Sequence, residues 1–283
     1  MARLLLFLAQ WDGTKLWLVI DRTHWELGET NHNLLVISAQ LGDTAMPLIW
    51  KALDKDGASN AAEAIALMKR LLTFLPAAQI AGLLADREFI DQGWMAWLQK
   101  QGIPFVIRIK QNTLAAFAGG TCAVAALCAR LREGQCSAIH TVTLSKGIGV
   151  GVQGKRTSKG IVIVVCNGMP PSEAEPVNLY RKRWRIECGF ACLKRKGFEL
   201  EDTHLVHADR LETMMGIVAI AFAWALAIGL LHPKPAIKKH GYPANCRFTL
   251  GKHALIHALN FTEKIIKLIA YPFSITKFNG AVV

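Results

Sequence analysis

Two aspartates follow short apolar runs in the first third of the sequence. Asp21 follows the run Leu16–Ile20, and Asp86 follows Ile80–Ala85. The residue types of both runs are typical of β-strands. Because functional groups of an α/β sheet commonly lie where a strand meets a loop, we expect the two carboxylates to share a site. Either aspartate alone would equally suit a turn or a helix cap.

A helix predicted over residues 177–196 carries four polar side chains on one face. At about 100° per residue, these side chains fall within an arc of about 60°. They are Tyr180, Arg183, Glu187 and Lys194. A different face carries a stripe expected to be buried, formed by Ile186, Phe190 and Leu193. A surface ladder of ion pairs would use similar residues, but a tyrosine hydroxyl and two cations beside one carboxylate favour a binding site.

Together, the three acidic residues have the chemistry of a divalent-metal site. Asp21, Asp86 and Glu187 supply the oxygen ligands that Mg²⁺ prefers. We expect two Mg²⁺ ions, with Mn²⁺ as an alternative, because paired ions promote in-line attack on a phosphodiester. Tyr180, Arg183 and Lys194 would then hold neighbouring phosphates of DNA.

Five segments, in order along the chain, resemble the insertion-sequence-four family of bacterial transposases. They are Ile20-Asp21-Arg22-Thr23-His24-Trp25, Gly57-Ala58-Ser59-Asn60, Ala85-Asp86-Arg87-Glu88-Phe89, Phe105-Val106-Ile107-Arg108-Ile109-Lys110, and the Tyr-x2-Arg-x3-Glu-x6-Lys signature from Tyr180 to Lys194. The similarity runs from about Leu16 to about Gly229. It implies a ribonuclease-H-like catalytic core with a β-rich insertion before the glutamate helix.

The resemblance also implies an activity and its residues. Such DDE transposases cut transposon-end DNA and join its 3′-hydroxyls to target DNA, several through a hairpin intermediate, as homodimers on paired ends. By resemblance, Asp21, Asp86 and Glu187 are the catalytic metal ligands. Tyr180, Arg183 and Lys194 would contact transposon-end DNA.

Two features depart from the family pattern. Only 20 residues precede Asp21, whereas full-length members carry a sizeable N-terminal domain that binds the terminal inverted repeats. We therefore expect a truncated form. Residues 111–178 contain no tryptophan, so an indole that stacks on a flipped base cannot be assigned in the insertion.

The elements that must position these groups are predicted from local patterns. Strands are expected over 16–20, 34–38, 46–50, 80–85 and 105–109, with helices over 60–74 and 92–101. This order indicates an α/β fold, a mixed sheet flanked by helices. Within 111–178 we expect strands at 141–144 and 161–165, beside loops rich in Gly and Lys. The predicted parts are 1–110 and 179–232 for the core, 111–178 for the insertion, and 233–283 for a basic C-terminal segment.

Charge and composition limit the class of protein. Hydrophobic residues make up 52% and charged residues 19%, which excludes a disordered chain. Residues 1–99 hold eight Lys/Arg against eleven Asp/Glu, while residues 100–283 hold twenty-five against ten. The basic part implies a polyanionic partner, nucleic acid or anionic lipid. Seven cysteines without framework spacing, and no secretory leader, predict reduced thiols and a cytoplasmic protein.

Residues 214–231 contain no charged side chain and approach the length of a membrane span. Five alanines and two glycines make the stretch weakly apolar, and no second candidate exists in the sequence. We therefore expect a buried core helix and no membrane partner.

Several other motifs are not expected to carry function. Gly149, Gly151 and Gly154 match a dinucleotide fingerprint in spacing, but a strand is expected after them rather than a helix, which favours a flexible basic hairpin. Two cysteines and four histidines lack the partners of a zinc or protease site. They are Cys188, Cys192, His204, His207, His253 and His257.

Three hypotheses follow. The first is a Mg²⁺-dependent transposase that cleaves transposon ends and transfers strands to target DNA. The second is a catalytically idle fragment that pairs with a full-length transposase, motivated by the short N-terminal region. The third is a membrane protein built on residues 214–231.

Overall fold

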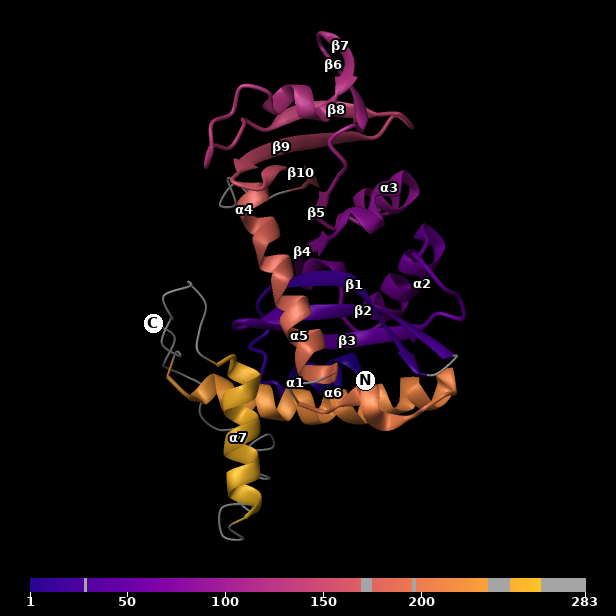
Figure 1. The fold of residues 1–283 in the computed structure, drawn as a ribbon, viewed down its shortest axis with the longest axis vertical. Coiled ribbons are helices and arrows are strands. Elements are labelled where there is room, and N and C mark those ends of the chain that lie inside the picture. The colour runs from indigo at the N-terminus through magenta and orange to yellow at the C-terminus, as the bar shows by residue number, and fades with distance from the viewer. Residues whose placement is uncertain (28–29, 169–174, 195–196, 234–244, 261–283) are drawn as a thin grey trace.

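A single mixed sheet runs through the chain (Figure 1). The computed structural model describes residues 1–283 apart from 28–29, 169–174, 195–196, 234–244 and 261–283. Within the described residues the sheet has ten strands, in the order β3-β2-β1-β4-β5-β10-β9-β8-β6-β7. The strands are β1 (Leu16–Leu27), β2 (Thr30–Leu41), β3 (Thr44–Ala52), β4 (Ile80–Ala85), β5 (Phe105–Arg108), β6 (Leu114–Phe117), β7 (Gly120–Ala123), β8 (His140–Leu144), β9 (Gly149–Thr157) and β10 (Gly160–Asn167).

Strands β1, β2 and β3 are antiparallel, whereas β4 pairs parallel to β1 and β5 parallel to β4. This arrangement confirms the mixed α/β sheet expected for a ribonuclease-H-like core. One boundary was predicted wrongly, because β1 pairs with β2 as far as Leu27↔Thr30. Asp21 therefore lies within β1 rather than at its end. The parallel pairing of β1 with β4 does end just before it, at Ile20↔Ala85.

The strands between residues 114 and 167 continue the same sheet, because β10 pairs antiparallel with β5. The basic hairpin expected at the glycines of residues 149–154 is present, because β9 and β10 pair antiparallel from Gly160↔Thr157 to Cys166↔Gly151. The Gly- and Lys-rich loop expected between residues 144 and 161 was wrong, since most of it is strand β9. Its glycines serve close packing: a Cβ on Gly154 would collide with Cys128, and one on Gly151 would lie 2.9 Å from the Cys166 sulfur. The insertion boundaries at residues 111 and 178 stay predictions.

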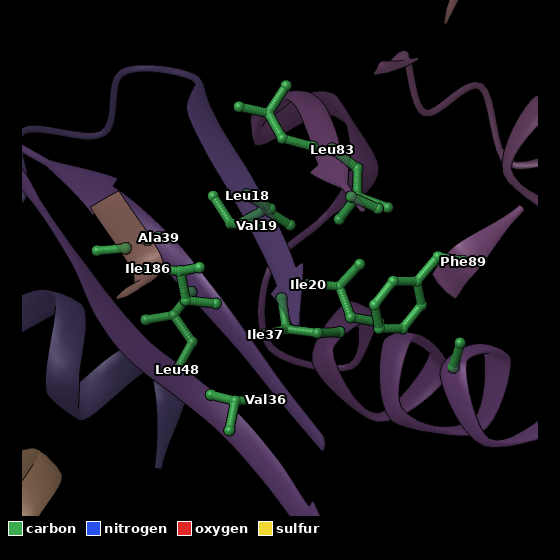
Figure 2. Close-up of a cluster of buried hydrophobic side chains, with 14 of the residues drawn as sticks. Leu18, Val19, Ile20, Val36, Ile37, Ala39, Leu48, Leu83, Phe89 and Ile186 are labelled. Atoms are coloured by element: carbon green, nitrogen blue, oxygen red, sulfur yellow. The ribbon is translucent and has the colours of Figure 1, made fainter. Parts of the chain in front are cut away.

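Helices pack against the sheet or against one another. They are α1 (Ala2–Leu8), α2 (Ala61–Leu72), α3 (Gln92–Lys100), α4 (Pro176–Tyr180), α5 (Trp184–Lys194), α6 (Ala208–Leu231) and α7 (Arg247–Leu259). Helix α2 begins where predicted, because Asn60 accepts a hydrogen bond from the Glu63 amide while Glu63 accepts one from the Asn60 amide. The core cluster in Figure 2 joins side chains of β1 to β4 with Phe89 and with Ile186 of α5.

The segment predicted as one helix over 177–196 has three parts. A single 3₁₀ turn, η4 (Arg181–Arg183), separates α4 from α5. Because a 3₁₀ turn has about 3.0 residues rather than about 3.6, a projection at a constant 100° per residue misplaces the side chains on either side of it. Helix α5 crosses β1, β2 and β3 (Figure 1).

Helix α6 contains the apolar stretch 214–231 and packs against β3, α1 and α7. Among the described residues, α6 is the one helix that is both long enough and apolar enough to span a membrane. Of its most apolar 18-residue stretch, 61% is buried inside the protein. This packing agrees with the predicted core helix. Of the predicted C-terminal segment, α7 is described and residues 234–244 and 261–283 lie outside the described residues.

Candidate active site

The register of the sheet places Asp21 beside Asp86. Each aspartate comes directly after the last parallel pair, Ile20↔Ala85, of β1 and β4. Side chains alternate across a strand, so Asp21 points to the face opposite the buried Ile20. Asp86 caps the 3₁₀ helix η2 (Arg87–Phe89), and its Oδ1 accepts a 2.6 Å hydrogen bond from the Arg87 amide.

The third carboxylate, Glu187, is positioned by the packing of α5 on the sheet. Ile186 is fully buried, and the backbone at Gly189 lies so close to β3 that a Cβ there would be 2.5 Å from the Ala45 carbonyl oxygen. Only glycine permits this approach. Phe190 and Leu193 are also buried, as the predicted stripe required.

The guanidinium of Arg183 bridges two of the carboxylates. Its Nη1 donates to Asp21 Oδ2 at 2.6 Å, and its Nη2 donates to Glu187 Oε1 at 2.5 Å. The Arg183 side chain is 13% exposed. Charge-assisted hydrogen bonds of this length are strong where water is largely excluded. A cation therefore already lies between Asp21 and Glu187.

Tyr180 completes the cluster from α4. Its hydroxyl donates to Asp86 Oδ1 at 3.1 Å, and its ring lies 5.9 Å from the Arg183 guanidinium carbon. Two elements distant in sequence, the end of the β1–β4 pairing and the α4–η4–α5 segment, thus meet at three carboxylates, one tyrosine and one arginine.

Burial and the mutual repulsion of the carboxylates both shift the pKa values of this cluster. Burial raises the pKa of Asp21 to about 6, and the charges of Asp86 and Glu187 add to this against the opposing effect of Arg183. Burial, together with the charge of Asp86, raises the pKa of Tyr180 to about 12, so its hydroxyl stays a hydrogen-bond donor at neutral pH. The surrounding anionic groups raise the pKa of Arg183 despite its burial. An additional cation would relieve the repulsion among the carboxylates.

Residues 13–224 match the family described as "Transposase DDE domain". The chain belongs to this family. No curated protein sequence matches the chain.

Three solved structures are similar to this DDE domain, each at low sequence identity. A piggyBac transposase synaptic complex with hairpin DNA shows 9% identity and a TM-score of 0.45, covering 94% of this chain and 59% of that chain. Endonuclease V from Bacillus subtilis shows 10% identity and a TM-score of 0.36, covering 73% and 84%. A protein of unknown function from Archaeoglobus fulgidus shows 14% identity and a TM-score of 0.29, covering 59% of this chain and 95% of that chain. The chain therefore spans about three fifths of the piggyBac chain.

DDE transposases generally use divalent metal ions, and the donor set fits such an ion. Carboxylate oxygens are the ligands of hard cations, and Arg183 shows that a positive charge is stabilised between Asp21 and Glu187. The described residues contain no group of three His, Cys, Asp or Glu side chains already arranged around a cation position. Arg183 holds the position between Asp21 and Glu187 in this structure.

Lys194 lies apart from the three carboxylates. Its Nζ donates to the His24 carbonyl at 2.8 Å, pairs with Glu201 at 2.8 Å, and lies 5.4 Å from the centre of the Trp25 ring. Lys194 follows Glu187 by seven residues, about 10 Å along a helix, so it reaches a later part of β1 than Asp21.

Residues missed by the sequence interpretation surround the site. A hollow of about 430 Å³ next to Tyr180 and Arg183 is lined by further basic side chains and by Trp184, which is 53% exposed. Those basic side chains are Arg108, Lys155 and Arg181. The net positive charge of residues 100–283 was the available signal, but it did not indicate which of its many cations gather here.

Proposed function

We propose that this chain is a DNA transposase that cleaves the ends of a transposon and transfers them to target DNA. The observation that supports the proposal most is that Asp21 and Glu187 share the Arg183 guanidinium, while Asp86 accepts a hydrogen bond from the neighbouring Tyr180, in a DDE-domain chain. Carboxylates in this number, with too little positive charge beside them, suit binding of a divalent ion more than they suit stability.

Asp21, Asp86 and Glu187 would hold two Mg²⁺ ions, or Mn²⁺ in their place. Bound there, divalent ions lower the pKa of an attacking water or 3′-hydroxyl and stabilise the leaving oxygen of an in-line displacement. Within the chain itself, the buried face of α5 orients Glu187 against the sheet. Burial of Asp21 excludes water that would otherwise compete for its oxygens.

Arg183 and Tyr180 gain a second role once the carboxylates are neutralised. Arg183 would then be available to bind a phosphate through its planar fork. Tyr180 remains protonated, because its pKa is about 12, and donates its hydroxyl hydrogen bond to a phosphate oxygen. Lys194, which lies against a later part of β1, would contact the DNA backbone at another phosphate. Its ion pair with Glu201 would be replaced by that phosphate.

The finer assignment extends this proposal. We place the chain in the insertion-sequence-four group, with cut-and-paste transposition. Its partners would be transposon-end DNA, target DNA and a second copy of the chain on paired ends. We expect it to act in the cytoplasm.

The proposal is tested with supercoiled plasmid carrying the genomic sequence that flanks this reading frame. We expect the plasmid to be nicked in millimolar Mg²⁺. We expect no nicking when EDTA removes the metal. Glu187→Gln should abolish nicking while the circular-dichroism spectrum and thermal midpoint stay close to those of the unaltered chain. Glu133→Gln, which changes an exposed glutamate in the insertion, is the matched control. Nicking that survives Glu187→Gln would contradict the proposed function.

A further inference from the structure

Two residues that follow Asp21 and Asp86 closely in the sequence form an ion pair with each other. Arg22 follows Asp21, and Glu88 comes two residues after Asp86. Arg22 Nε donates to Glu88 Oε1 at 2.7 Å, and Nη2 donates to Oε2 at 3.2 Å. The two side chains are only 16% and 22% exposed. This is a bidentate, partly buried pair rather than a loose surface contact.

The pair begins where the backbone ladder ends. Strands β1 and β4 are joined through Ile20↔Ala85 and no further. Asp21 and Asp86 therefore lie between a hydrogen-bonded backbone pair on one side and the Arg22–Glu88 pair on the other.

Each partner of the pair is held by further hydrogen bonds. Arg22 Nη1 donates to Asn33 Oδ1 at 2.9 Å, and the Asn33 amide nitrogen donates to the carbonyls of Lys55 and Gly57. Asn33, on β2, is only 3% exposed. The ion pair is therefore anchored to β2 and to the turn that begins at Gly57.

The Glu88 end is anchored to the same turn. Glu88 Oε1 accepts from the Ser59 amide at 3.1 Å and from the Ser59 hydroxyl at 3.0 Å. Gly57 has a φ of +83°, a conformation that favours glycine and turns the chain toward Glu88. We define Arg22, Glu88, Asn33 and Ser59 as the brace.

The brace has the character of a support rather than of a ligand. Glu88 accepts three hydrogen bonds at Oε1, from Arg22 and from the Ser59 amide and hydroxyl, and one at Oε2 from Arg22, while the contacts of Arg22 go to Glu88 and Asn33. Alternation along β1 directs Arg22 to the face opposite Asp21. Groups that orient metal-binding side chains without touching the ion commonly change metal affinity by about 10–100-fold.

We propose that the brace fixes the separation of Asp21 and Asp86, and that Arg22 and Glu88 are positioning residues for the divalent ion that these carboxylates hold. The inference rests on the proposed function, because it concerns the geometry of the same carboxylates. It assigns a physical role to Asn33 and to the turn at residues 57–60, which otherwise lie outside the site.

The test is Mn²⁺ binding measured by isothermal titration calorimetry on the full chain, without DNA and with the flanking-sequence duplex. Glu88→Gln keeps the side-chain shape and removes its charge. Arg22→Lys keeps the charge and removes the fork. We expect each to weaken the Mn²⁺ dissociation constant by about 10-fold or more, and the double variant to weaken it little further. Lys51→Gln, which breaks the ion pair with Glu212 on β3 and α6, is the control and should leave the constant unchanged.

A second measurement separates positioning from stability. Thermal midpoints are recorded for all variants, and nicking is followed as a function of Mg²⁺ concentration. A brace that positions the carboxylates shifts the Mg²⁺ midpoint upward by about 10-fold, with activity recovering at high Mg²⁺. A purely stabilising ion pair lowers the thermal midpoint and leaves the Mg²⁺ midpoint unchanged, which would overturn the proposal.

Failure of the inference is distinguishable from failure of the proposed function. If the unaltered chain binds Mn²⁺ and Asp21→Asn abolishes this binding, but both brace variants bind normally, the brace inference alone is overturned. If Glu88→Gln abolishes binding as completely as Asp21→Asn while Arg22→Lys has no effect, Glu88 is itself a ligand and the inference is also overturned. If the unaltered chain binds no Mn²⁺ even with DNA, the proposed function and the brace inference fail together.

Discussion

The three carboxylates are held in two different ways. Asp21 and Asp86 are fixed by backbone register, because each follows the pair Ile20↔Ala85 of the central strands. Glu187 has no backbone pairing with the sheet and depends on how closely α5 packs against β3. The comparison teaches that the two aspartates form the fixed half of the site, and that the helix half sets whether the third carboxylate reaches them.

The largest effect is expected at the contact between Gly189 of α5 and Ala45 of β3. Gly189→Ala places a methyl group 2.5 Å from the Ala45 carbonyl oxygen and must push α5 outward. We expect roughly 100-fold slower nicking, because misplacement of a catalytic group by about 1 Å costs this much. The loss of unfolding free energy should be about 1–3 kcal/mol.

Gly149→Ala is the matched control for that helix contact, because a Cβ there meets nothing within 4 Å and its φ is not positive. It should retain nicking within about twofold. Equal activity of Gly189→Ala and Gly149→Ala, measured in the same plasmid assay, would show that the approach of α5 does not control the site.

The next effect tests the link between the two halves. Arg183→Gln leaves Asp21 and Glu187 without their shared cation, so we expect a loss of about 2–3 kcal/mol of unfolding free energy at pH 7 without metal. Millimolar Mg²⁺ should offset more of this loss than it adds to the unaltered chain, since Arg183 no longer competes for the carboxylates.

Urea unfolding with and without Mg²⁺ measures this difference between the Arg183 variant and the unaltered chain. Arg181→Gln, at an exposed arginine two residues away, is the control. A variant that loses stability but responds to Mg²⁺ no more than the unaltered chain would argue against Arg183 as the occupant of the cation position.

A smaller effect is expected in the pH dependence of stability, through Asp21 of the fixed half. Burial raises the pKa of Asp21 to about 6 in the folded chain, above an unfolded value of about 3.9. The folded state therefore holds the proton more tightly. Its stabilising contribution is complete below about pH 4 and is lost as pH rises through about 6.

For the metal-free chain, we expect this one group to remove about 2 kcal/mol of unfolding free energy between pH 4 and pH 7. Asp21→Asn should flatten that part of the profile when urea midpoints are compared across the range. A profile with the same slope in both proteins would mean that Asp21 titrates normally.

The smallest effect is expected at the far end of α5. Lys194 pairs with Glu201 at 2.8 Å, so Glu201→Gln should free the lysine for phosphate and strengthen DNA binding by a few fold, less than about 1 kcal/mol. Fluorescence anisotropy with a labelled duplex of the flanking sequence measures this change. The double variant Glu201→Gln/Lys194→Gln should lose the gain, and a gain that persists would come from removal of a negative charge alone.

Local patterns made much of the fold predictable. Helix α2 starts within one residue of its predicted start at residue 60, because the residues that cap it, Asn60 and Glu63, are neighbours in sequence. Strand β4 has the predicted bounds, since a buried apolar run ends at a loop. Asp21 and Asp86 could be expected at one site because each directly follows an apolar run that forms a strand, and the two strands lie side by side.

Contacts between distant residues were not predictable in the same way. The 3₁₀ turn η4 changes the phase of the helix that carries Glu187, and no local pattern indicated it. The ion pair of Lys194 with Glu201 depends on the path of the chain after α5, which no local sequence pattern gives. Strand β9 was taken for a loop because its glycines, which fit against Cys128 and Cys166, have the composition of a turn.

The central claim is that Asp21, Asp86 and Glu187 bind a divalent ion at the position that Arg183 now occupies. Anomalous scattering from Mn²⁺ in crystals of the chain, with the flanking-sequence duplex bound, tests it most directly. We predict two peaks at and beside this position that together lie within about 2.3 Å of oxygens from all three carboxylates, with the Arg183 guanidinium moved toward phosphate. Mn²⁺ bound elsewhere, with Arg183 still bridging Asp21 and Glu187, would contradict the claim.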